Sequence, residues 1–175
     1  MTFLVESRRL LLVETPREIL SRRLSEEDFE DYVNVGGTRE MILFPSEWPG
    51  DSLGLFPHWI DEMDSDRELW SGTIIDKTDL AAVGQMGFKG LADKDGVVEI
   101  GYNVSPAYQR RGYATEMAGA LSEWALRQRA VRRVAAECLA ENIASIRVLE
   151  KAGFVRTGSR SSDEGPLIVW NRLPR

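Results

Sequence analysis

The sequence predicts a single α/β domain of the α+β type, in which a mixed and mostly antiparallel sheet carries helices on both faces. Its 175 residues are about the length of one domain. With 43% hydrophobic and 29% charged residues, the chain has the composition of an ordinary globular protein. Strand-like runs bounded by turns occupy much of residues 72–104, and helical and strand-like runs alternate after residue 113. We therefore expect one domain over residues 1–175.

The beginning of the chain predicts one strand and two helices. Residues 9–15 are rich in leucine and valine and are followed by Pro16, which favours a strand and then a helix with proline in its first turn. The stretch Ser25-Glu26-Glu27-Asp28 has the pattern of a helix start, with serine as N-cap and an acid three residues later. Gly36-Gly37 would end this second helix.

The middle of the chain predicts loops and then a meander. Residues 41–68 hold prolines, glycine and scattered aromatic residues, which predict loops around one short helix near residues 59–63. Three strand-like runs with turn residues between them follow, and such a series is typical of an antiparallel meander. These runs are residues 72–75, 82–88 and 97–104.

After residue 110 the apolar residues change to helical spacing. The predicted elements are a helix over 113–129, a strand over 134–139, a helix over 143–149 and strands over 154–158 and 166–170. Because a strand–helix–strand unit needs a crossover connection, strands 97–104 and 134–139 are expected to be parallel neighbours. The polar stretch 157–165 is expected to be a loop.

Composition excludes several classes of protein. A single cysteine, Cys138, cannot form an internal disulfide, and with one histidine, His58, no zinc-holding cluster is available, so no metal is expected. No apolar run approaches the roughly 18 residues that span a bilayer, and the amino terminus lacks the pattern of a signal peptide. We expect a cytoplasmic protein without membrane contacts.

Charge is distributed unevenly along the chain. Residues 1–100 carry 21 acidic and 10 basic side chains, whereas residues 101–175 carry 7 acidic and 12 basic ones. This pattern favours an anionic ligand on the second half and a cationic ligand on the first, although an unevenly charged solvated surface explains it equally well. Nucleic acid is not an expected partner, because there is no dense basic run and the net charge is −6.

The stretch from Glu99 to Thr115 contains the most informative motif. A strand ends, a short turn rich in arginine and glycine follows, and a helix begins at about Tyr113. A helix N-terminus presents unpaired backbone N–H groups and the positive end of the helix dipole, which together bind phosphate oxygens. Gly112 would allow a close approach of the backbone, and Arg110 and Arg111 add positive charge.

Two motifs resemble those of the GNAT superfamily of N-acetyltransferases. Gln109-Arg110-Arg111-Gly112-Tyr113-Ala114 resembles its Q/R-x-x-G-x-G/A signature for acetyl-CoA. Residues 141–154 resemble its second cofactor motif, in which an asparagine opens a helix that closes with Lys-x-Gly-Phe. The spelling of both is most similar to the branch that acetylates ribosomal proteins, of the RimJ/RimL type. The close resemblance covers residues 97–158, and residues 34–69 match little.

The resemblance implies a GNAT fold whose sheet is splayed at the cofactor cleft, and transfer of acetyl from acetyl-CoA to a primary amine by direct attack. The acceptor would be the α-amino group of a protein or a small-molecule amine, and the resemblance allows a homodimer without predicting one. An alternative is a catalytically inactive domain that binds acyl-CoA as a sensor or scaffold.

The resemblance also implies roles for individual residues. A backbone N–H at Asn103 or Val104 would bind the thioester carbonyl, and Asn142 would contact the pantetheine arm. The pyrophosphate would lie on the turn and helix start formed by Gln109, Arg110, Arg111, Gly112, Tyr113, Ala114 and Thr115.

Two candidate catalytic residues follow. Glu99 would be the base, directly or through a water, because it lies on the strand beside the expected thioester; the alternative is a solvated carboxylate. Many members carry a tyrosine as the acid where this sequence has Leu149. Ser145, one helical turn after Asn142, is the candidate replacement, although a helix-start serine also bonds to backbone.

Other tempting residues have simpler explanations. His58 has no partner nearby in sequence to complete a catalytic dyad, and a lone histidine in an aromatic loop is more often structural. Trp48, Phe56 and Trp59 would line an acceptor cleft or, more simply, pack in the core, and the same holds for Trp70. Cys138 lies in an apolar run and is expected to be buried rather than nucleophilic.

Overall fold

The computed structural model of the protein describes residues 4–63 and 70–174. In chain order its elements are β1 (Leu4–Glu6), β2 (Leu10–Val13), α1 (Arg17–Arg23), β3 (Phe29–Val35), β4 (Thr38–Phe44), η1 (Gly50–Leu55), α2 (Phe56–Glu62), β5 (Ser71–Asp76), β6 (Ala81–Phe88), β7 (Val97–Val104), η2 (Pro106–Tyr108), α3 (Tyr113–Leu126), β8 (Arg133–Leu139), α4 (Ile143–Lys151), β9 (Val155–Ser162) and β10 (Gly165–Arg172). The short helix expected near residues 59–63 is α2, and residues 64–68 of the predicted loop region lie outside the described residues.

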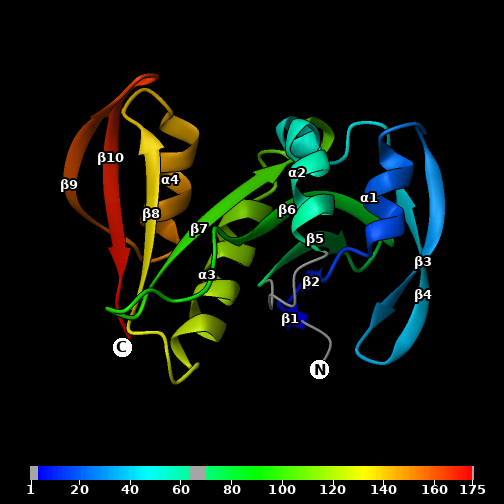
Figure 1. Ribbon diagram of the computed structural model, residues 1–175, viewed down its shortest axis with the longest axis horizontal. Coiled ribbons are helices and arrows are strands. Elements are labelled where there is room, and N and C mark those ends of the chain that lie inside the picture. Colours follow the sequence, from blue (N-terminus) through cyan, green and yellow to red (C-terminus); the bar gives the residue numbers. More distant parts are fainter. Residues whose placement is uncertain (1–3, 64–69, 175) are drawn as a thin grey trace.

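The described strands form one mixed sheet. Its order is β1-β2-β5-β6-β7-β8-β10-β9, and β4 joins β6 while β3 pairs with β4 (Figure 1). Two contacts are parallel, β7 with β8 and the single pair Leu43–Ala81 between β4 and β6, and the remaining ones are antiparallel. The predicted meander over β5, β6 and β7 and the predicted parallel neighbours β7 and β8 are therefore confirmed.

Helices cover both faces of the sheet. Strand β5 shows the division, because Ile74 belongs to the core beneath α3 and α4, while Ile75 belongs to the core beneath α1 and α2. Both isoleucines are fully buried. The first core contains Leu121 of α3, and the second contains the stacked pair Phe29–Phe44 of β3 and β4. Neighbouring residues of one strand face opposite sides of the sheet, so a single strand serves both cores.

The second predicted helix, beginning at Ser25, is wrong. Residues 29–44 instead form an antiparallel hairpin of β3 and β4, with Val35 opposite Thr38. Gly36 and Gly37 have φ angles of 59° and 98°, and two consecutive positive φ angles make the tight turn that suits the twist of a two-stranded hairpin. Gly36-Gly37 is thus a hairpin turn rather than a helix end.

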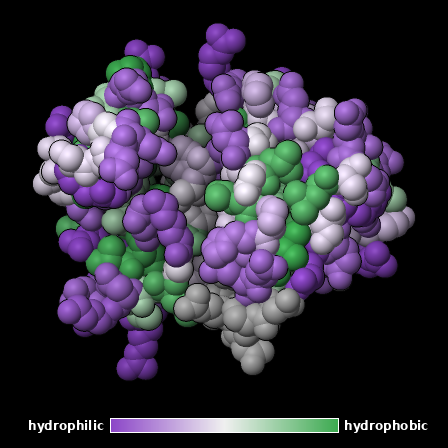
Figure 2. Space-filling model, turned by 45° about the horizontal axis from the view of Figure 1, so that its top comes forward, coloured by the Kyte–Doolittle hydropathy of each residue, from purple (hydrophilic) through white to green (hydrophobic). Residues whose placement is uncertain are grey.

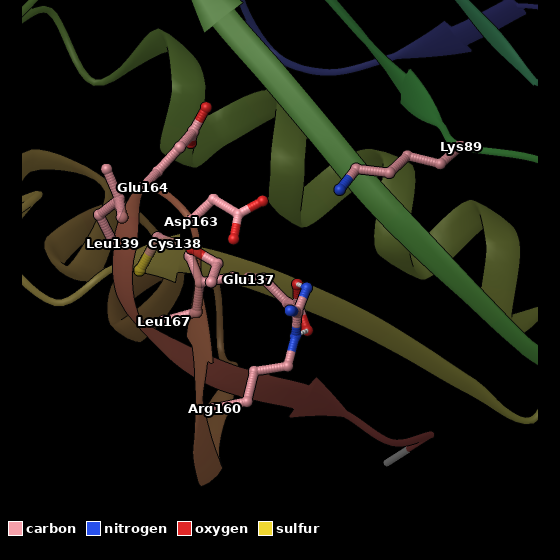
Figure 3. A pocket seen from close by; sticks show the side chains of 9 residues that line it. Lys89, Glu137, Cys138, Leu139, Arg160, Asp163, Glu164 and Leu167 are labelled. Atoms are coloured by element: carbon pink, nitrogen blue, oxygen red, sulfur yellow. Dashed lines mark hydrogen bonds and ion pairs between the residues drawn. The ribbon is translucent and has the colours of Figure 1, made fainter.

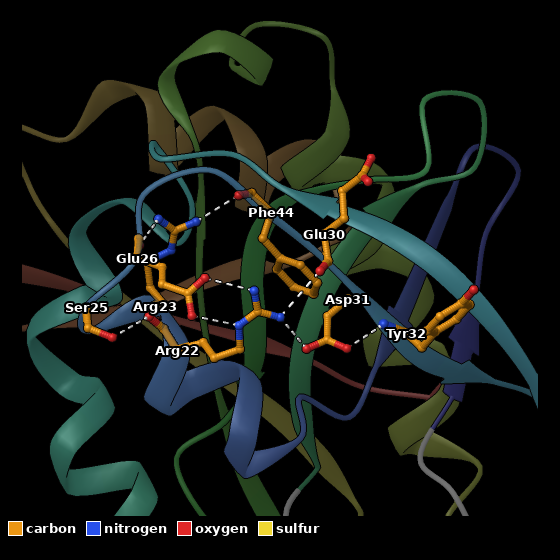
Figure 4. A network of polar contacts seen from close by, with 8 residues as sticks. All are labelled: Arg22, Arg23, Ser25, Glu26, Glu30, Asp31, Tyr32 and Phe44. Atoms are coloured by element: carbon orange, nitrogen blue, oxygen red, sulfur yellow. Dashed lines mark hydrogen bonds and ion pairs between the residues drawn. The ribbon is translucent and has the colours of Figure 1, made fainter.

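The side chains of Arg22 and Arg23 explain why the chain turns at Ser25 (Figure 4). Arg22 donates to both carboxylate oxygens of Glu26 and to Asp31 at 2.7–2.9 Å, and Ser25 Oγ donates back to the Arg22 carbonyl. Arg23 is 5% exposed and donates to the carbonyls of Glu26, Phe44 and Pro45. Ser25 therefore ends α1 instead of starting a helix.

The polar stretch 157–165, expected to be a loop, is mostly strand. Residues 155–162 form β9, which pairs with β10 from Gly165–Ser162 to Asn171–Val155. Nearly all of β9 is exposed, so it carries no apolar alternation that a sequence pattern would detect. Its backbone hydrogen bonds to β10 hold it at the edge of the sheet.

Candidate active site

Strands β7 and β8 separate after a short paired stretch. Their pairs are Val97–Arg133, Val98–Val134 and Glu99–Ala135, and beyond Glu99 no pair joins them. From Ile100 to Val104, β7 stays paired with β6 only, while β8 continues beside β10 to Leu139. The sheet is therefore splayed, and a gap opens between the C-terminal parts of two parallel strands (Figure 1).

A helix start lies at the end of β7, beyond this gap. Gly112 is the N-cap of α3 with a φ of 79°, and no side chain caps the helix. Glu116 N–H donates to the Gly112 carbonyl, so the N–H groups of Tyr113, Ala114 and Thr115 come before the first intrahelical bond. Arg110 also has a positive φ, 60°. This turn exposes backbone donors at the positive end of a helix dipole, where phosphate binds.

The first strands of the chain hold this turn from behind. Arg9 Nη2 donates to the Arg111 carbonyl at 3.0 Å, and Arg9 Nε donates to Glu116 Oε2 at 2.7 Å. Glu116 Oε1 also accepts from Arg9 N–H and from Ser7 Oγ. Burial opposes the charge of Glu116, but these hydrogen bonds outweigh it and hold the pKa of Glu116 below its usual range. The Glu116 carboxylate thus holds the Arg9 guanidinium in place, and Arg9 in turn holds the turn through the Arg111 carbonyl.

The side chain of Tyr113 is part of the same support. Its ring lies 4.7 Å beneath the Arg9 guanidinium, it is 7% exposed, and its hydroxyl donates to Asp76 Oδ2 at the end of β5. Asp76 Oδ1 accepts the N–H groups of Thr78 and Asp79. What Tyr113 offers to a ligand is consequently its backbone N–H, because its side chain is buried in this support.

The remaining residues expected on the cofactor side lie along the gap. Gln109 Nε2 donates to the Val104 carbonyl at 2.9 Å, which closes the turn onto the end of β7. Asn103 donates to Ser52 of η1, and its Oδ1 is buried without a partner in the described residues. Asn142 is the N-cap of α4, where its Oδ1 accepts Ser145 N–H at 3.0 Å, leaving its amide N–H₂ group unused by the cap.

Glu99 lies at the point where the strands part, and its carboxylate forms an ion pair with Lys89. Glu137 of β8 shares this face of the sheet, because Glu99 is level with Ala135 and Glu137 is two residues further along. Arg160 of β9 binds Glu137 through two hydrogen bonds of 2.8 and 2.5 Å and holds the pKa of Glu137 below its usual range. Two ion pairs therefore lie beside the gap.

A cavity of about 500 Å³ adjoins these ion pairs. Its lining residues are Lys89, Glu137, Cys138, Leu139, Arg160, Ser162, Asp163, Glu164 and Leu167. The side chains of Lys89 and Asp163 point toward one another across it, whereas Glu164 points away (Figure 3). Seen from outside, a hollow runs between the two halves of the molecule (Figure 2). Together with Glu99, carboxylates outnumber cations around the cavity, which suits a cationic ligand.

Ser145 lies on the opposite face of β7 from Glu99. Its Oγ is 2.8 Å from the hydroxyl oxygen of Tyr102, which belongs to the alternate set of β7 side chains that face α3 and α4. Burial raises the pKa of Tyr102 to about 12. Leu149, at the position where related proteins would carry a tyrosine, is fully buried in the core. The serine hydroxyl thus bonds to a tyrosine from a strand, not to helix backbone.

His58 and the aromatic candidates Trp48, Phe56 and Trp59 lie on the side of α1 and α2, and Cys138 is buried in β8. His58 is largely exposed on α2, 3.6 Å from Glu62. Trp48 and Phe56 are fully buried in the core, and Trp59 packs against them. Cys138 is buried and its Sγ accepts the indole N–H of Trp170 at 3.3 Å.

Several residues of the site were missed by sequence reasoning. Tyr102 lies inside the recognised motif, and its alternation with Glu99 could have placed it on the helix side. Glu137 is a lone acid in an apolar strand, and the predicted parallel register would have put it on the face of Glu99. Arg9 and Arg160 carry no local signal, because their partners are more than 20 residues away.

The residues at the turn and gap fit coenzyme A. Free N–H groups at the start of α3 suit its pyrophosphate, and the unpaired edge of β7 suits its amide-containing pantetheine arm. Gly112 has a left-handed φ of 79°, which glycine adopts without strain, so the turn can keep this conformation. In residues 4–63 and 70–174, no set of three His, Cys, Asp or Glu side chains is gathered for a metal, and no helix is long and apolar enough to cross a membrane.

A splayed mixed sheet with an uncapped helix start after strand β7 is the arrangement that the sequence led us to expect of a GNAT fold. Residues 18–155 match the model of the acetyltransferase (GNAT) domain, and the chain belongs to the GNAT family. It is 33% identical over 113 residues to the uncharacterized N-acetyltransferase YjdG of Bacillus subtilis, covering 62% of this chain and 67% of YjdG. Two further B. subtilis proteins, YnaD and YoaA, align over 35% and 43% of their own lengths.

Solved structures share the fold over the whole chain. An acetyltransferase of the GNAT family from Bacillus anthracis superposes with a TM-score of 0.70 at 19% identity, covering 97% of this chain and 98% of the other. RimL, a ribosomal L7/L12 α-N-protein acetyltransferase in complex with coenzyme A, superposes with a TM-score of 0.66 at 14% identity, covering 99% and 98%. The expected GNAT fold, an α/β domain with a splayed sheet, is therefore confirmed.

Proposed function

We propose that the protein is an acetyl-CoA-dependent N-acetyltransferase that acetylates a primary amine by direct attack. The observation that carries this proposal is the separation of β7 and β8 after Glu99, with an uncapped helix start at the far end of the same strand. One strand thus connects a phosphate site to a carboxylate, with an unpaired strand edge between them. Membership of the GNAT family supports the proposal.

The cofactor-binding residues are those along this path. The N–H groups from Gly112 to Thr115 would hold the pyrophosphate, with Gln109, Arg110 and Arg111 shaping the turn before them. Asn142 would bind the pantetheine arm through its free amide group. A backbone N–H at Asn103 or Val104 would face the thioester oxygen, where negative charge develops as the amine attacks.

The chemistry that acetyl-CoA supplies is an acetyl thioester. An amine attacks it only in the neutral form, so a group must take a proton from the nitrogen. Glu99 would do so, directly or through a water; it is paired with Lys89, which lines the cavity. As the C–N bond forms and the C–S bond breaks, the electron pair of the latter goes to sulfur. The proton lost by nitrogen balances the one that sulfur finally takes up.

The acceptor class follows from the cavity. Asp163 faces into it, Glu137 and Glu99 border it, and Lys89 and Arg160 only partly offset them. A cationic molecule that carries a primary amine would be attracted there. A protein N-terminus and a small polyamine share this chemistry, and both have room to enter through the open hollow between the two halves of the molecule.

Calorimetric titration with acetyl-CoA tests the cofactor, with ATP as the control ligand. We expect saturable binding of acetyl-CoA alone, and loss of binding in Gly112→Trp, because the left-handed φ strains any side chain there and a bulky indole would cover the exposed N–H groups. No binding by the parent protein would refute the proposal.

Turnover with a panel of cationic amines and N-terminal peptides tests the enzyme. Glu99→Gln should lower turnover by about 10²-fold with little change in acetyl-CoA affinity, as removal of a general base does. Unchanged turnover would exclude Glu99 as the base. Binding of acetyl-CoA without transfer to any amine would favour the alternative, a sensor that binds acyl-CoA.

A further inference from the structure

Two hydroxyl groups from distant parts of the chain meet at the gap between β7 and β8. Tyr102 Oη and Ser145 Oγ are 2.8 Å apart, one from β7 beyond its last pair with β8, the other from the first turn of α4. Neither hydroxyl has another hydrogen-bond partner in the described part of the chain. Their contact spans the gap along which the pantetheine arm is proposed to lie.

The surroundings of the pair keep the Tyr102 hydroxyl protonated and able to donate. Tyr102 is largely buried, and desolvation raises its pKa to about 12, so its hydroxyl keeps its proton at any physiological pH. The Cys138 thiol of β8 adds to this effect on the Tyr102 pKa, and its Sγ accepts the indole N–H of Trp170. Either hydroxyl can donate in this contact, and in the orientation in which Tyr102 donates, the Ser145 hydrogen is free to point into the gap.

Ser145 is also held by its own backbone. Its N–H donates to Asn142 Oδ1 at 3.0 Å, so the serine is fixed in the first turn of α4 by the helix cap. Cap and tyrosine together leave the side chain little freedom. A donor that is fixed before the reaction stabilises developing charge without the cost of ordering itself during it.

We propose that Tyr102 is a positioning residue that orients the Ser145 hydroxyl as a hydrogen-bond donor to the departing sulfur. The proposal rests on the proposed function, because it takes the sulfur to lie in the gap. When the C–S bond breaks, sulfur receives its electron pair and leaves as a thiolate stabilised by the Ser145 hydrogen; it takes its proton from water as coenzyme A departs. Tyr102 and Ser145 end the step with the protons they had.

This arrangement puts the two proposed catalytic groups on opposite faces of β7. Glu99 meets the amine on the cavity side, and Ser145 meets the sulfur on the helix side. The attacking nitrogen and the departing sulfur are different substituents of the tetrahedral carbon, so each can be contacted by its own group. The buried Leu149 makes no polar contact, which leaves the hydroxyl pair as the donor from this helix.

The direct test is the pKa of the coenzyme A thiol when bound, followed by the ultraviolet absorbance of its thiolate. A hydrogen bond to the thiolate favours it, so we expect a lower pKa for the bound thiol than for free coenzyme A. Tyr102→Phe and Ser145→Ala should each raise it again by about one unit, which is the size of one hydrogen bond to a charged group. This measurement needs no acceptor amine.

Turnover gives a second readout. Each single variant should lower kcat by about tenfold with acetyl-CoA affinity within twofold of the parent, and the double variant should be no slower than either, because the two groups act as one unit. Ser145→Thr keeps the hydroxyl and should retain most activity. Tyr32→Phe, which removes an exposed hydroxyl on β3, is the matched control and should change nothing.

The outcomes separate this inference from the proposed function. A parent protein that binds coenzyme A but acetylates no amine would refute the enzyme, while a lowered thiol pKa that depends on Tyr102 would still support the inference. A thiol pKa that is the same in parent, Tyr102→Phe and Ser145→Ala would overturn the inference even in an active enzyme. Failure of the parent to bind coenzyme A would overturn both.

Discussion

Replacement of Arg9 tests whether the start of the chain determines cofactor affinity. The guanidinium of Arg9 is bound to the protein on two sides. Its Nε donates to Glu116 at 2.7 Å, and its Nη2 donates to the Arg111 carbonyl at 3.0 Å. The turn that it holds contains two positive φ angles, 60° at Arg110 and 79° at Gly112. Such a turn has other conformations available once it is released, and only the observed one presents the N–H groups together.

The size of the effect follows from the contacts. Arg9→Met keeps the apolar stem but removes the charged donor of the Arg111 carbonyl, and a hydrogen bond to a charged group is worth about 1.5 kcal/mol at the low end that suits a partly exposed site. The side chain is 37% exposed, which is why we take the low value. A loss of that size corresponds to about tenfold weaker binding of coenzyme A.

Calorimetry with two ligands tests the predicted loss of affinity. Coenzyme A should bind Arg9→Met about tenfold more weakly, whereas pantetheine, which lacks the pyrophosphate, should bind parent and variant alike. Arg9→Lys keeps the charge without the forked geometry and should resemble Arg9→Met. Arg8→Met, at the exposed neighbouring position, is the control. Unchanged affinity for coenzyme A, or an equal loss for pantetheine, would refute a role for Arg9 in holding the turn.

Two further predictions concern stability. Arg23→Met should lower the free energy of unfolding by about 3 kcal/mol, because a buried guanidinium and its bonds to three carbonyls, one of them buried, are lost. Arg22→Met, at a partly exposed position, is the control and should cost far less; equal losses in urea denaturation would contradict this. Burial opposes the charge of Asp76, but hydrogen bonds from Tyr113, Asp79 and Thr78 outweigh it and keep its pKa below 3.8. The contribution of Asp76 to folding stability is therefore present above pH 3.8 and is lost as the pH falls through the pKa of Asp76 in the folded protein. Asp76→Asn should flatten the acid limb of a thermal-stability profile, and an unchanged acid limb would exclude the effect.

The parts of the fold that sequence predicted are those in which local pattern and tertiary environment agree. Strands β5 to β7 are separated by turns, and α3 has a continuous apolar face, so period and boundary point the same way. The prediction for residues 25–37 was wrong, and the hairpin of β3 and β4 was not foreseen, because Ser25-x-x-Asp28 is a good local helix start. The competing signal was Gly36-Gly37 between two alternating runs, which is a hairpin pattern.

The first half of strand β9 was predicted, as a strand over 154–158, whereas its continuation to Ser162 was missed for another reason. Its residues are exposed, so neither face selects apolar side chains, and its existence depends on the backbone of β10 alone. One of its arginines, Arg160, nevertheless reaches the site through Glu137. A residue supplied by an edge strand without pattern is invisible until the sheet is assembled.

The candidate site also has a part that sequence motifs describe and a part that depends on the assembled sheet. The turn around Gly112 and the helix cap at Asn142 are local structures, in which residues within a few positions of one another make the ligand-facing groups, and sequence motifs describe them well. Acid–base groups are different, because what an acid or base does depends on which face of the sheet it occupies and what it meets there. Strand β7 has both kinds of position: Glu99 faces Lys89 and the cavity, whereas Tyr102, three residues on, faces Ser145. An odd separation on a strand puts two residues on opposite faces, so the position of each residue along β7, and not its identity, separates the group proposed for the amine from the group proposed for the sulfur.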